Sequence, residues 1–292
     1  MIGIDWGTTR FRAYLLDEAG HALEKRATDR GILEVPGGYF AAVLREEVGD
    51  WIAAGQPRVL LSGMIGSRQG WHEVSYLPCP AGAAELGAAL ARVEFASAEV
   101  RIMPGLSSAD AAGVPEVMRG EETEIVGAME KLPDRAQVCL PGSHAKWVTV
   151  EGGRIQGFAT HLTGEAFAAL KGHTILGRMM RDGPLATDAF DRGVARSGEA
   201  GGLLHHLFGV RTLALSGKLR EVEAASYLSG LMIGHEVRAA MGEPARVHLI
   251  GAPDLCDCYA RAITAAGGEA IVLAPEQAAA GLPRIAAMAK WR

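Results

Sequence analysis

A strand–turn–strand pattern at the start of the chain returns near its middle, and this repeat limits the possible folds more than any other feature. Met1 to Asp17 reads as an apolar strand, an Asp, a Gly-Thr-Thr turn and an alternating second strand, with a third strand expected at 21–27. From Gln137 the same order recurs around a Gly-Ser turn, and each copy is followed by a helix. We therefore expect an α/β protein whose two halves each open with a β-meander.

Both copies place a glycine turn directly after an apolar strand. In the first, Gly7 lets the backbone pass close to a bulky ligand, while the hydroxyls of Thr8 and Thr9 supplement backbone N–H groups in a cup that suits phosphate oxygens. Asp5 precedes this turn and is placed to hold a hydrated Mg²⁺. Taken alone, the segment is equally well explained as an ordinary hairpin. The second turn, Gly142-Ser143, favours the phosphate interpretation, because two such turns can each hold one part of a polyphosphate.

The composition narrows the partners and the location. The 292 residues suggest about two domains, and 49% hydrophobic with 22% charged residues is ordinary for a soluble protein with a sizeable core. The net charge of −5 and the lack of a Lys/Arg block argue against nucleic-acid and membrane partners. No basic leader precedes the first strand, and no apolar run approaches the roughly 18 residues of a membrane span. We expect a cytoplasmic protein.

Neither the cysteines nor the adjacent histidines indicate a metal site. The Cys256-x-Cys258 pair lacks the second pair of ligands that a structural zinc ion needs, so we expect reduced thiols on a helix. Adjacent side chains on a helix point apart, which argues against an ion shared by His205 and His206.

The rest of the chain reads as alternating helices and strands. Apolar residues at helical spacing predict a helix at 39–54. Further helices are expected at 83–93, 117–131, 163–180 with Thr163 as N-cap, 221–241, from 255 and from 275. Strands are expected at 58–62, 100–103, 246–250 and 270–273, with irregular chain at 106–116. Residues 182–202 read as a loop and a helix start, and 203–215 give no clear pattern.

Three further segments carry candidate functional residues. The loop Gly63-Met64-Ile65-Gly66-Ser67 follows a buried strand, at the strand end where open α/β sheets bind ligands, and Trp71 follows it; a surface loop with a buried Trp is the alternative. Glu121 and Glu122 stand in the first turns of the expected helix 117–131, where the helix dipole favours acidic residues without any catalytic role. Gly251-Ala252 joins a strand to a helix, which suits a ribose or adenine but also occurs in ordinary α/β connections.

These segments, in this order, resemble the sugar-kinase, actin and Hsp70 superfamily. Asp5-Trp6-Gly7-Thr8-Thr9 resembles its first phosphate motif, Pro141 to Trp147 the second, Leu249-Ile250-Gly251-Ala252 the adenosine motif, and the helices at 117–131 and 221–241 its connecting helices. Over essentially the whole chain, the closer resemblance is to the 2-dehydro-3-deoxygalactonokinase family. The strings that carry it are Gly63-Met64-Ile65-Gly66-Ser67 with Gly70-Trp71, Met118-Arg119-Gly120-Glu121-Glu122-Thr123, Gly142-Ser143-His144 with Lys146-Trp147, Thr163-Gly164-Glu165, and Leu228-Ser229-Gly230-Leu231 with Ile233-Gly234.

The resemblance implies both a fold and an activity. The fold would consist of two ribonuclease-H-like domains, 1–118 and 119–292, of the actin-like ATPase or sugar-kinase type, with ATP in an interdomain cleft and a last helix able to pack back on the N-terminal domain. The activity would be a phosphotransferase that uses ATP and Mg²⁺ to phosphorylate the 6-hydroxyl of 2-dehydro-3-deoxy-D-galactonate in galactonate catabolism.

The same resemblance assigns roles to individual residues. Asp5 would hold Mg²⁺ through water, and the nucleotide would contact Gly7, Thr8, Thr9, Gly142, Ser143, His144, Lys146, Gly251 and Ala252. Related sugar kinases carry an Asp just after a Gly at the start of the corresponding helix, so Glu121 is the expected catalytic base, with Glu122 as its rival and Asp110 third. The sugar acid would contact Gly63, Met64, Gly66, Ser67 and Trp71, and backbone N–H groups, Arg12 or Arg119 would hold its carboxylate.

Two other functions stay open at this point. One is a kinase for another small sugar or sugar acid, such as 2-dehydro-3-deoxygluconate. The other is a non-catalytic ATP-binding module of the actin or chaperone type, although 292 residues leave little room for the subdomains inserted in such proteins. The expected partner is a small sugar acid, and a homodimer is left open.

Overall fold

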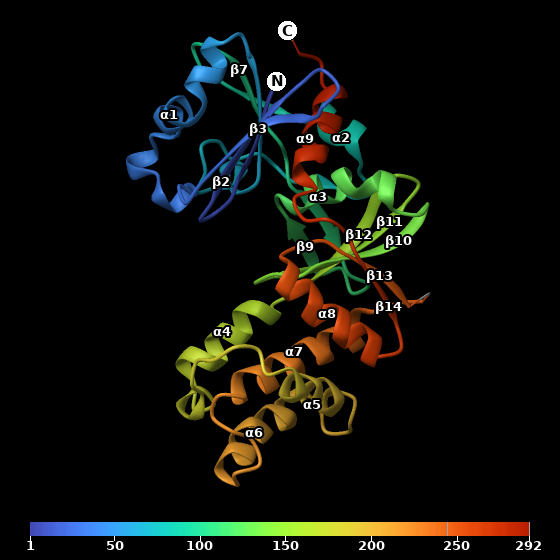
Figure 1. The fold of residues 1–292 in the computed structure, drawn as a ribbon. Helices are drawn as coiled ribbons and strands as arrows, with labels where there is room; N and C mark the ends of the chain where they lie inside the picture. The colour runs from blue at the N-terminus through green and yellow to red at the C-terminus, as the bar shows by residue number, and fades with distance from the viewer. Residues whose placement is uncertain (244, 292) are drawn as a thin grey trace. The chain divides into compact units, whose positions relative to one another are not determined.

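The structure, a computed structural model, describes residues 1–243 and 245–291 of the chain (Figure 1). Its contacts group the chain into two compact units. Unit 1 comprises Met1–Arg135, Thr149–Phe158 and Glu276–Arg292, and unit 2 comprises Ala136–Val148 and Ala159–Pro275. The chain therefore returns to unit 1 twice after leaving it. The domain boundary expected between residues 118 and 119 stays a prediction.

A six-stranded sheet forms the centre of unit 1, in the order β3-β2-β1-β4-β7-β6. Its strands are β1 (Ile2–Trp6), β2 (Phe11–Leu16), β3 (Ala22–Thr28), β4 (Arg58–Ser62), β6 (Ala91–Val93) and β7 (Glu99–Ile102). The first three form the expected antiparallel meander, whereas β1, β4 and β7 run parallel. The carboxyl ends of β1 and β4 therefore meet at one edge of the sheet, and Gly7 and Gly63 follow them there.

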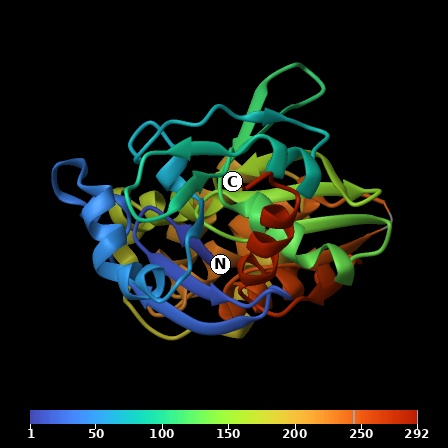
Figure 2. The same ribbon diagram turned by 90° about the horizontal axis from the view of Figure 1, so that it is seen from above.

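Helices cover both faces of this sheet. Successive residues of β1 point to opposite faces, and each set packs against a different helix. The large apolar residues of β1 belong to the same buried cluster as those of α1 (Phe40–Ala53). Gly3 points the other way, where its missing side chain makes room for Leu282 of α9 (Ala278–Ala287). Figures 1 and 2 show α1 and α9 on opposite sides of the N-terminal strands.

The remaining elements of unit 1 lead to α3 (Glu121–Ala128) and support it. A small sheet in the order β5-β8-β9 contains β5 (Leu77–Pro78), β8 (Leu106–Ala109) and β9 (Pro115–Met118). α3 packs closely on α9, since a side chain at Gly127 or Gly281 would clash with the facing backbone. The other helices of this unit are α2 (Ala83–Ala88) and the short η1 (Ile32–Glu34), η2 (Pro36–Gly38), η3 (Met64–Gly66) and η4 (Met129–Lys131).

A second sheet has the order β12-β11-β10-β13-β14. Its strands are β10 (Arg135–Leu140), β11 (Ala145–Glu151), β12 (Arg154–His161), β13 (Arg246–Leu249) and β14 (Glu269–Val272). β10, β13 and β14 run parallel, so the carboxyl ends of β10 and β13 meet at one edge. Gly142 and Gly251 follow these two strands, in the same way as Gly7 and Gly63 follow β1 and β4.

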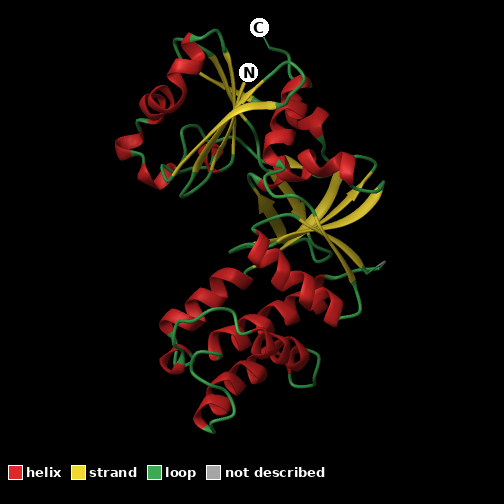
Figure 3. Ribbon diagram, viewed as in Figure 1, coloured by secondary structure: helices red, strands yellow, loops and turns green. Residues whose placement is uncertain are grey.

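The helices of unit 2 pack through small residues. They are α4 (Thr163–His173), η5 (Gly177–Met179), α5 (Thr187–Ser197), α6 (Gly202–Leu215), α7 (Ala224–Ala240) and α8 (Pro253–Ala265). α5 lies against α7 so closely that a side chain at Gly193 or Gly230 would clash with the facing backbone. Figure 3 shows the segment from α4 to α7 as a run of helices joined by loops.

The region before α3 differs from the sequence prediction. Residues 106–116 are not irregular, because β8 and β9 form an antiparallel hairpin there. The expected helix at 117–131 begins only at Glu121, since Val117 and Met118 pair with β8 and Gly120 adopts a φ of +111°. The expected helix at 83–93 ends at Ala88, because 91–93 pair with β7 at the sheet edge. At 91–93 and at 117–118, strand pairing overrode the helix that local sequence predicts.

Unit 2 also corrects two expectations. The helix expected at 163–180 ends at His173, and Thr163 is its first residue instead of its N-cap, which is Leu162. Residues 203–215, which showed no clear pattern, form most of α6. Cys256 and Cys258 are buried on α8, as expected, and neither forms a disulfide bond with a described residue.

Candidate active site

Asp5 lies at the sheet edge where β1 and β4 end, and it pairs with the neighbouring strand. Arg12 stands directly opposite it on β2, and Arg12 Nη1 donates to Asp5 Oδ2 at 2.8 Å. A Cβ at Gly63 would lie 3.2 Å from Asp5 Oδ1, and one at Gly120 would lie 3.4 Å from Gly63 Cα. The glycines therefore bring the end of β4 and the start of α3 close to the Asp5 carboxylate.

The turn after β1 has two exposed residues at its tip. Gly7 N–H donates to Arg10 O across the turn at 2.9 Å, so it is already in use. Thr8 and Thr9 are exposed, and their N–H groups make no backbone hydrogen bond to any described residue. Gly31 packs behind the turn, where any side chain would clash with the backbone of Thr8 and Thr9. The free N–H groups and hydroxyls of the tip suit an anion such as phosphate.

Glu121 and Glu122 have different surroundings at the start of α3. Glu122 is fully buried, and its two oxygens accept from Gly120 N–H at 2.9 and 2.8 Å. Glu121 is partly exposed, and one of its oxygens accepts from Arg119 N–H at 3.0 Å. Burial and the charge of Glu121 raise the pKa of Glu122 to about 8. Burial therefore makes Glu122 a poorer proton acceptor at neutral pH than an ordinary carboxylate, and Glu121 is the more accessible of the two.

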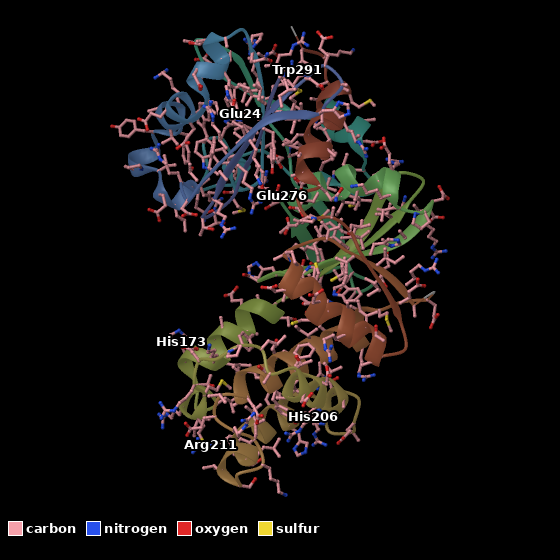
Figure 4. The ribbon with its side chains drawn as sticks, viewed as in Figure 1. Glu24, His173, His206, Arg211, Glu276 and Trp291 are labelled. Atoms are coloured by element: carbon pink, nitrogen blue, oxygen red, sulfur yellow. The ribbon has the colours of Figure 1, made fainter. Side chains whose placement is uncertain are left out.

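Glu124 is a third carboxylate in this region, and the sequence prediction missed it. Burial and the charge of Asp5 raise the pKa of Glu124 to about 7, while Arg12 opposes this shift. The charge of Glu276 adds to it; Figure 4 labels this residue, which precedes α9 and is ion-paired with Lys25. Burial also raises the pKa of Asp5, and Arg12 again acts in the opposite direction. The edge near Asp5 is therefore acidic and only partly neutralised.

The loop after β4, expected to contact the sugar acid, is a short 3₁₀ helix held by its own hydrogen bonds. Ser67 Oγ donates to Met64 O at 2.7 Å, and Trp71 N–H donates to Ile65 O at 2.9 Å. The Trp71 ring packs on the core of unit 1, edge-on to Phe95, so it has a structural role in this loop. Arg119 is buried beside Gly66, where a Cβ would lie 2.8 Å from Arg119 Nη1.

The turn after β10 has a similar construction in unit 2. Gly142 is open on its side-chain face, and Gly164 at the start of α4 packs behind the turn, where a Cβ would lie 2.5 Å from Gly142 O. Glu165 N–H donates to Ser143 O at 3.0 Å, and the Glu165 carboxylate contacts His144 Nε2. Ser143 and His144 are exposed at the tip.

Two more predicted nucleotide contacts lie near this second turn. Lys146 is buried on β11, and its Nζ donates to Thr160 Oγ1 at 3.1 Å. Gly251 follows β13, where a Cβ would lie 3.5 Å from Pro141 O. The structure therefore brings the second phosphate motif and the adenosine motif together at one sheet edge, with Ala252 as the N-cap of α8. Such strand ends are the usual ligand sites of open α/β sheets.

Asp110, the third choice for a base, has a different task. Its Oδ1 accepts from the N–H groups of Ala112 and Val114, both at 2.8 Å, and so closes the β8–β9 loop. Among the described residues, no three His, Cys, Asp or Glu side chains are grouped to hold a metal ion. None of the helices in the described part of the chain has the length and apolar character needed to cross a bilayer.

Comparisons with known proteins place the chain among sugar-acid kinases. A family model described as 2-keto-3-deoxy-galactonokinase matches residues 5–285. The 2-dehydro-3-deoxygalactonokinase of Escherichia coli (strain K12) is 35% identical over 289 residues, covering 98% of this chain and 97% of the relative. A Rhizobium meliloti (strain 1021) protein named as a probable enzyme of the same kind is 34% identical over 297 residues, covering 99% of this chain and 96% of the relative.

Solved structures agree with this assignment. A Sinorhizobium meliloti protein assigned to the same enzyme superposes with a TM-score of 0.89 at 31% identity, covering 98% of this chain and 97% of that one. The activator of the 2-hydroxyisocaproyl-CoA dehydratase from Clostridium difficile, solved with bound ADPNP, shares the fold alone, with a TM-score of 0.52 at 14% identity over 99% of this chain and 94% of that one. The α/β fold class expected from the sequence, that of actin-like ATPases and sugar kinases, is thereby confirmed. The chain belongs to the 2-keto-3-deoxy-galactonokinase family.

Proposed function

We propose that this chain transfers the γ-phosphoryl group of ATP to the 6-hydroxyl of 2-dehydro-3-deoxy-D-galactonate, as a step of galactonate catabolism. Family membership makes it a phosphotransferase with an alcohol acceptor. The observation that carries the proposal is the sheet edge in unit 1, where glycines bring Asp5 and the start of α3 close together. That edge offers a carboxylate for a hydrated cation beside a carboxylate for proton transfer.

Glu121 is proposed as the base. Phosphoryl transfer needs in-line positioning, neutralisation of the γ-phosphoryl oxygens and an acceptor for the hydroxyl proton. Glu121 is partly exposed and anchored by one oxygen to Arg119 N–H, whereas Glu122 is enclosed and holds Gly120 N–H with both oxygens. The proton of the 6-hydroxyl would pass to the Glu121 carboxylate as the new phosphate ester bond forms and the bond to ADP breaks.

The two glycine turns are proposed to contact ATP phosphates. Thr8 and Thr9 offer exposed N–H groups and hydroxyls in unit 1, and Gly142 and Ser143 offer an open backbone in unit 2. Backbone donors held in place before the ligand arrives need no reorganisation, which is the way such turns favour phosphates. Gly251, which lies beside Pro141, and the following residue Ala252 are assigned to the adenosine.

The residues around Asp5 fit a magnesium ion held through water. Its Oδ2 is paired with Arg12, while Oδ1 faces Gly63, where any larger residue would place its Cβ 3.2 Å away. Magnesium keeps several waters and usually takes only one or two protein carboxylates plus phosphate oxygens, so one carboxylate of this kind is sufficient. When bound, the ion would neutralise charge on the phosphate oxygens. The Asp5 carboxylate would orient the water molecules that surround the ion.

A panel of sugar acids tests the proposal. ADP release is measured with 2-dehydro-3-deoxygalactonate, the gluconate epimer, neutral sugars and no acceptor. We expect turnover that depends on a sugar acid and is fastest with the galactonate compound. ATP hydrolysis that ignores every sugar acid would refute the kinase assignment, whereas preference for the gluconate epimer would refute only the substrate.

Location and assembly follow as smaller proposals. A catabolic kinase works where ATP is made and used, so we propose a cytoplasmic enzyme; fractionation of cells that carry a tagged chain would test this. The sequence leaves a homodimer open, and light scattering coupled to size exclusion would give the mass directly.

A further inference from the structure

Arg119 is buried with part of its guanidinium unsatisfied. Its side chain lies just before α3, the residue is 9% exposed, and Nη2 donates to Val74 O at 2.7 Å. Nε and Nη1 have no hydrogen-bond partner in the part of the chain that the structure describes. A guanidinium carries five N–H donors, and leaving donors of a charged group unmet in the interior destabilises the protein. Such a group calls for an explanation beyond packing.

The surroundings do not supply Arg119 with a strong counter-charge. Within residues 1–243 and 245–291 the structure shows no ion pair to this side chain. Its charge does act on Glu122, but the pKa of that carboxyl is raised to about 8 and both oxygens hold Gly120 N–H. Arg12 is different, because its Nη1 is paired with Asp5 at 2.8 Å. Of the two candidate arginines, Arg119 is therefore the one whose charge is left for a ligand.

The unsatisfied nitrogens lie between the loop after β4 and an exposed aromatic ring. A Cβ at Gly66 would be 2.8 Å from Arg119 Nη1, so a glycine is what lets the guanidinium lie against this loop. On another side, the guanidinium carbon is 4.5 Å from the centroid of the Tyr76 ring, and Tyr76 is 41% exposed. A ligand that reaches Arg119 from solvent would therefore displace Tyr76, not a core residue.

We propose that Arg119 binds the carboxylate of the substrate and thereby selects sugar acids over neutral sugars. The inference rests on the proposed function, because it assumes a sugar-acid acceptor. A carboxylate oxygen would accept from Nη1 and complete the donors that the free protein leaves unmet. The substrate carries its carboxylate at carbon 1 and the accepting hydroxyl at carbon 6. Contacts from Arg119 and Glu121, two residues apart at the start of α3, would thus fix both ends of one molecule.

The test separates binding of the acid from binding of ATP. Arg119→Gln should raise KM for the sugar acid about 10- to 100-fold, the range for losing charge-assisted hydrogen bonds, with KM for ATP unchanged within about two-fold. Arg119→Lys keeps the positive charge but not the planar guanidinium, so its KM for the sugar acid should lie between those of wild type and Arg119→Gln. Arg154→Gln is the matched control, since Arg154 is exposed and ion-paired with Glu85 on the same unit, and should leave both constants unchanged.

An analogue with a hydroxymethyl group in place of the carboxylate gives a readout that a structural role would not move. Wild type should use this analogue about 10- to 100-fold less well than the acid, and Arg119→Gln should discriminate little between them. If Arg119→Gln keeps the wild-type preference for the acid, or raises KM for the acid and KM for the analogue by the same factor, the proposal is wrong. Should that variant not fold, Arg119→Lys decides: a wild-type acid preference overturns the proposal, and a reduced one supports it. Failure of wild type to phosphorylate any sugar acid would instead refute the proposed function.

Discussion

The turns after β1 and β10 share one construction but differ in their charged surroundings. Each follows a strand at the carboxyl edge of a parallel pair, and each is backed by a glycine, Gly31 in unit 1 and Gly164 in unit 2. The first turn stands beside acidic side chains, of which Asp5 and Glu124 have raised pKa values. The second stands beside the buried amine of Lys146 and beside His144, which is paired with the carboxylate of Glu165.

This difference suggests a division of work between similar parts. In both turns, exposed backbone groups that need no rearrangement suit phosphate oxygens. Around the first turn, carboxylates suit a hydrated cation and a proton acceptor; around the second, basic groups suit phosphate charge. We therefore expect changes to the carboxylates around the first turn to act mainly on kcat, and changes that displace the backbone of either turn to act mainly on KM for ATP.

The largest effect is expected at Glu121. Glu121→Gln keeps the size of the side chain but removes the proton acceptor, so kcat should fall by about 10²- to 10⁴-fold. Steady-state ADP release with saturating sugar acid measures it, and ATP binding by calorimetry should be unchanged. Glu122→Gln is the neighbouring control, and its kcat should stay within about ten-fold of wild type. Near-normal turnover in Glu121→Gln together with a loss in Glu122→Gln would reverse the two assignments.

Asp5→Asn should have the next largest effect. The amide can still accept from Arg12, but it no longer carries the charge that orders a hydrated cation. We expect kcat/KM for ATP to fall about 10- to 100-fold, with a higher magnesium concentration needed for half-maximal rate. Initial rates over a magnesium titration measure both. A variant with the magnesium dependence of wild type would show that Asp5 serves only to pair with Arg12.

The glycines behind the turns allow a direct comparison of the two regions. Gly31→Ala places a Cβ against the backbone of Thr8 and Thr9, and Gly164→Ala places one 2.5 Å from Gly142 O. Displacing either turn should raise KM for ATP roughly ten-fold, since overpacking costs about 1–3 kcal/mol. Gly172→Ala, in the same helix as Gly164 but with open space around it, is the control and should change nothing. If Gly31→Ala, Gly164→Ala and Gly172→Ala all have the same KM for ATP, the turns do not bind its phosphates as proposed.

The smallest effect is expected for Glu122→Gln, and it concerns the pH dependence of the melting temperature. Burial raises its pKa from 4.5 to about 8, so the folded chain binds this proton more tightly than the unfolded chain. Its contribution to the free energy of unfolding is therefore full below about pH 4.5 and declines as the pH rises to about 8. Glu122→Gln removes this decline, so its melting temperature relative to wild type should increase from pH 5 to pH 8. A constant difference over that range would show that the carboxyl is ionised in the folded protein.

Much of the fold followed from sequence because the patterns there were long. The repeated meander and the helix at 39–54 have clear periodicity, the strand at 58–62 is a short apolar run, and each formed as expected. The β8–β9 hairpin was missed, since Ser, Ala and Gly residues gave no alternation and its strands are set by pairing with each other. α6 was missed because its apolar and polar residues are not segregated to separate faces.

The candidate site was predictable in its motifs but not in its contacts. Gly7 and Gly142 were found because glycine turns after apolar strands are visible in the sequence. The enclosure of Glu122 and the unmet donors of Arg119 depend on residues far away in the chain. The use of Gly7 N–H by Arg10 O depends on the exact conformation of the turn. Glu124 was missed because a helix-borne Glu looks like a solvated one until the helix is packed.

Identifying the hydroxyl that receives the phosphoryl group tests the proposed reaction itself. Wild type is incubated with ATP, magnesium and 2-dehydro-3-deoxy-D-galactonate, and the product is examined by phosphorus–proton correlation NMR. We expect a phosphate monoester coupled to the two protons on carbon 6, formed in step with ADP. Phosphate on another hydroxyl, or inorganic phosphate released with the sugar acid unchanged, would contradict it.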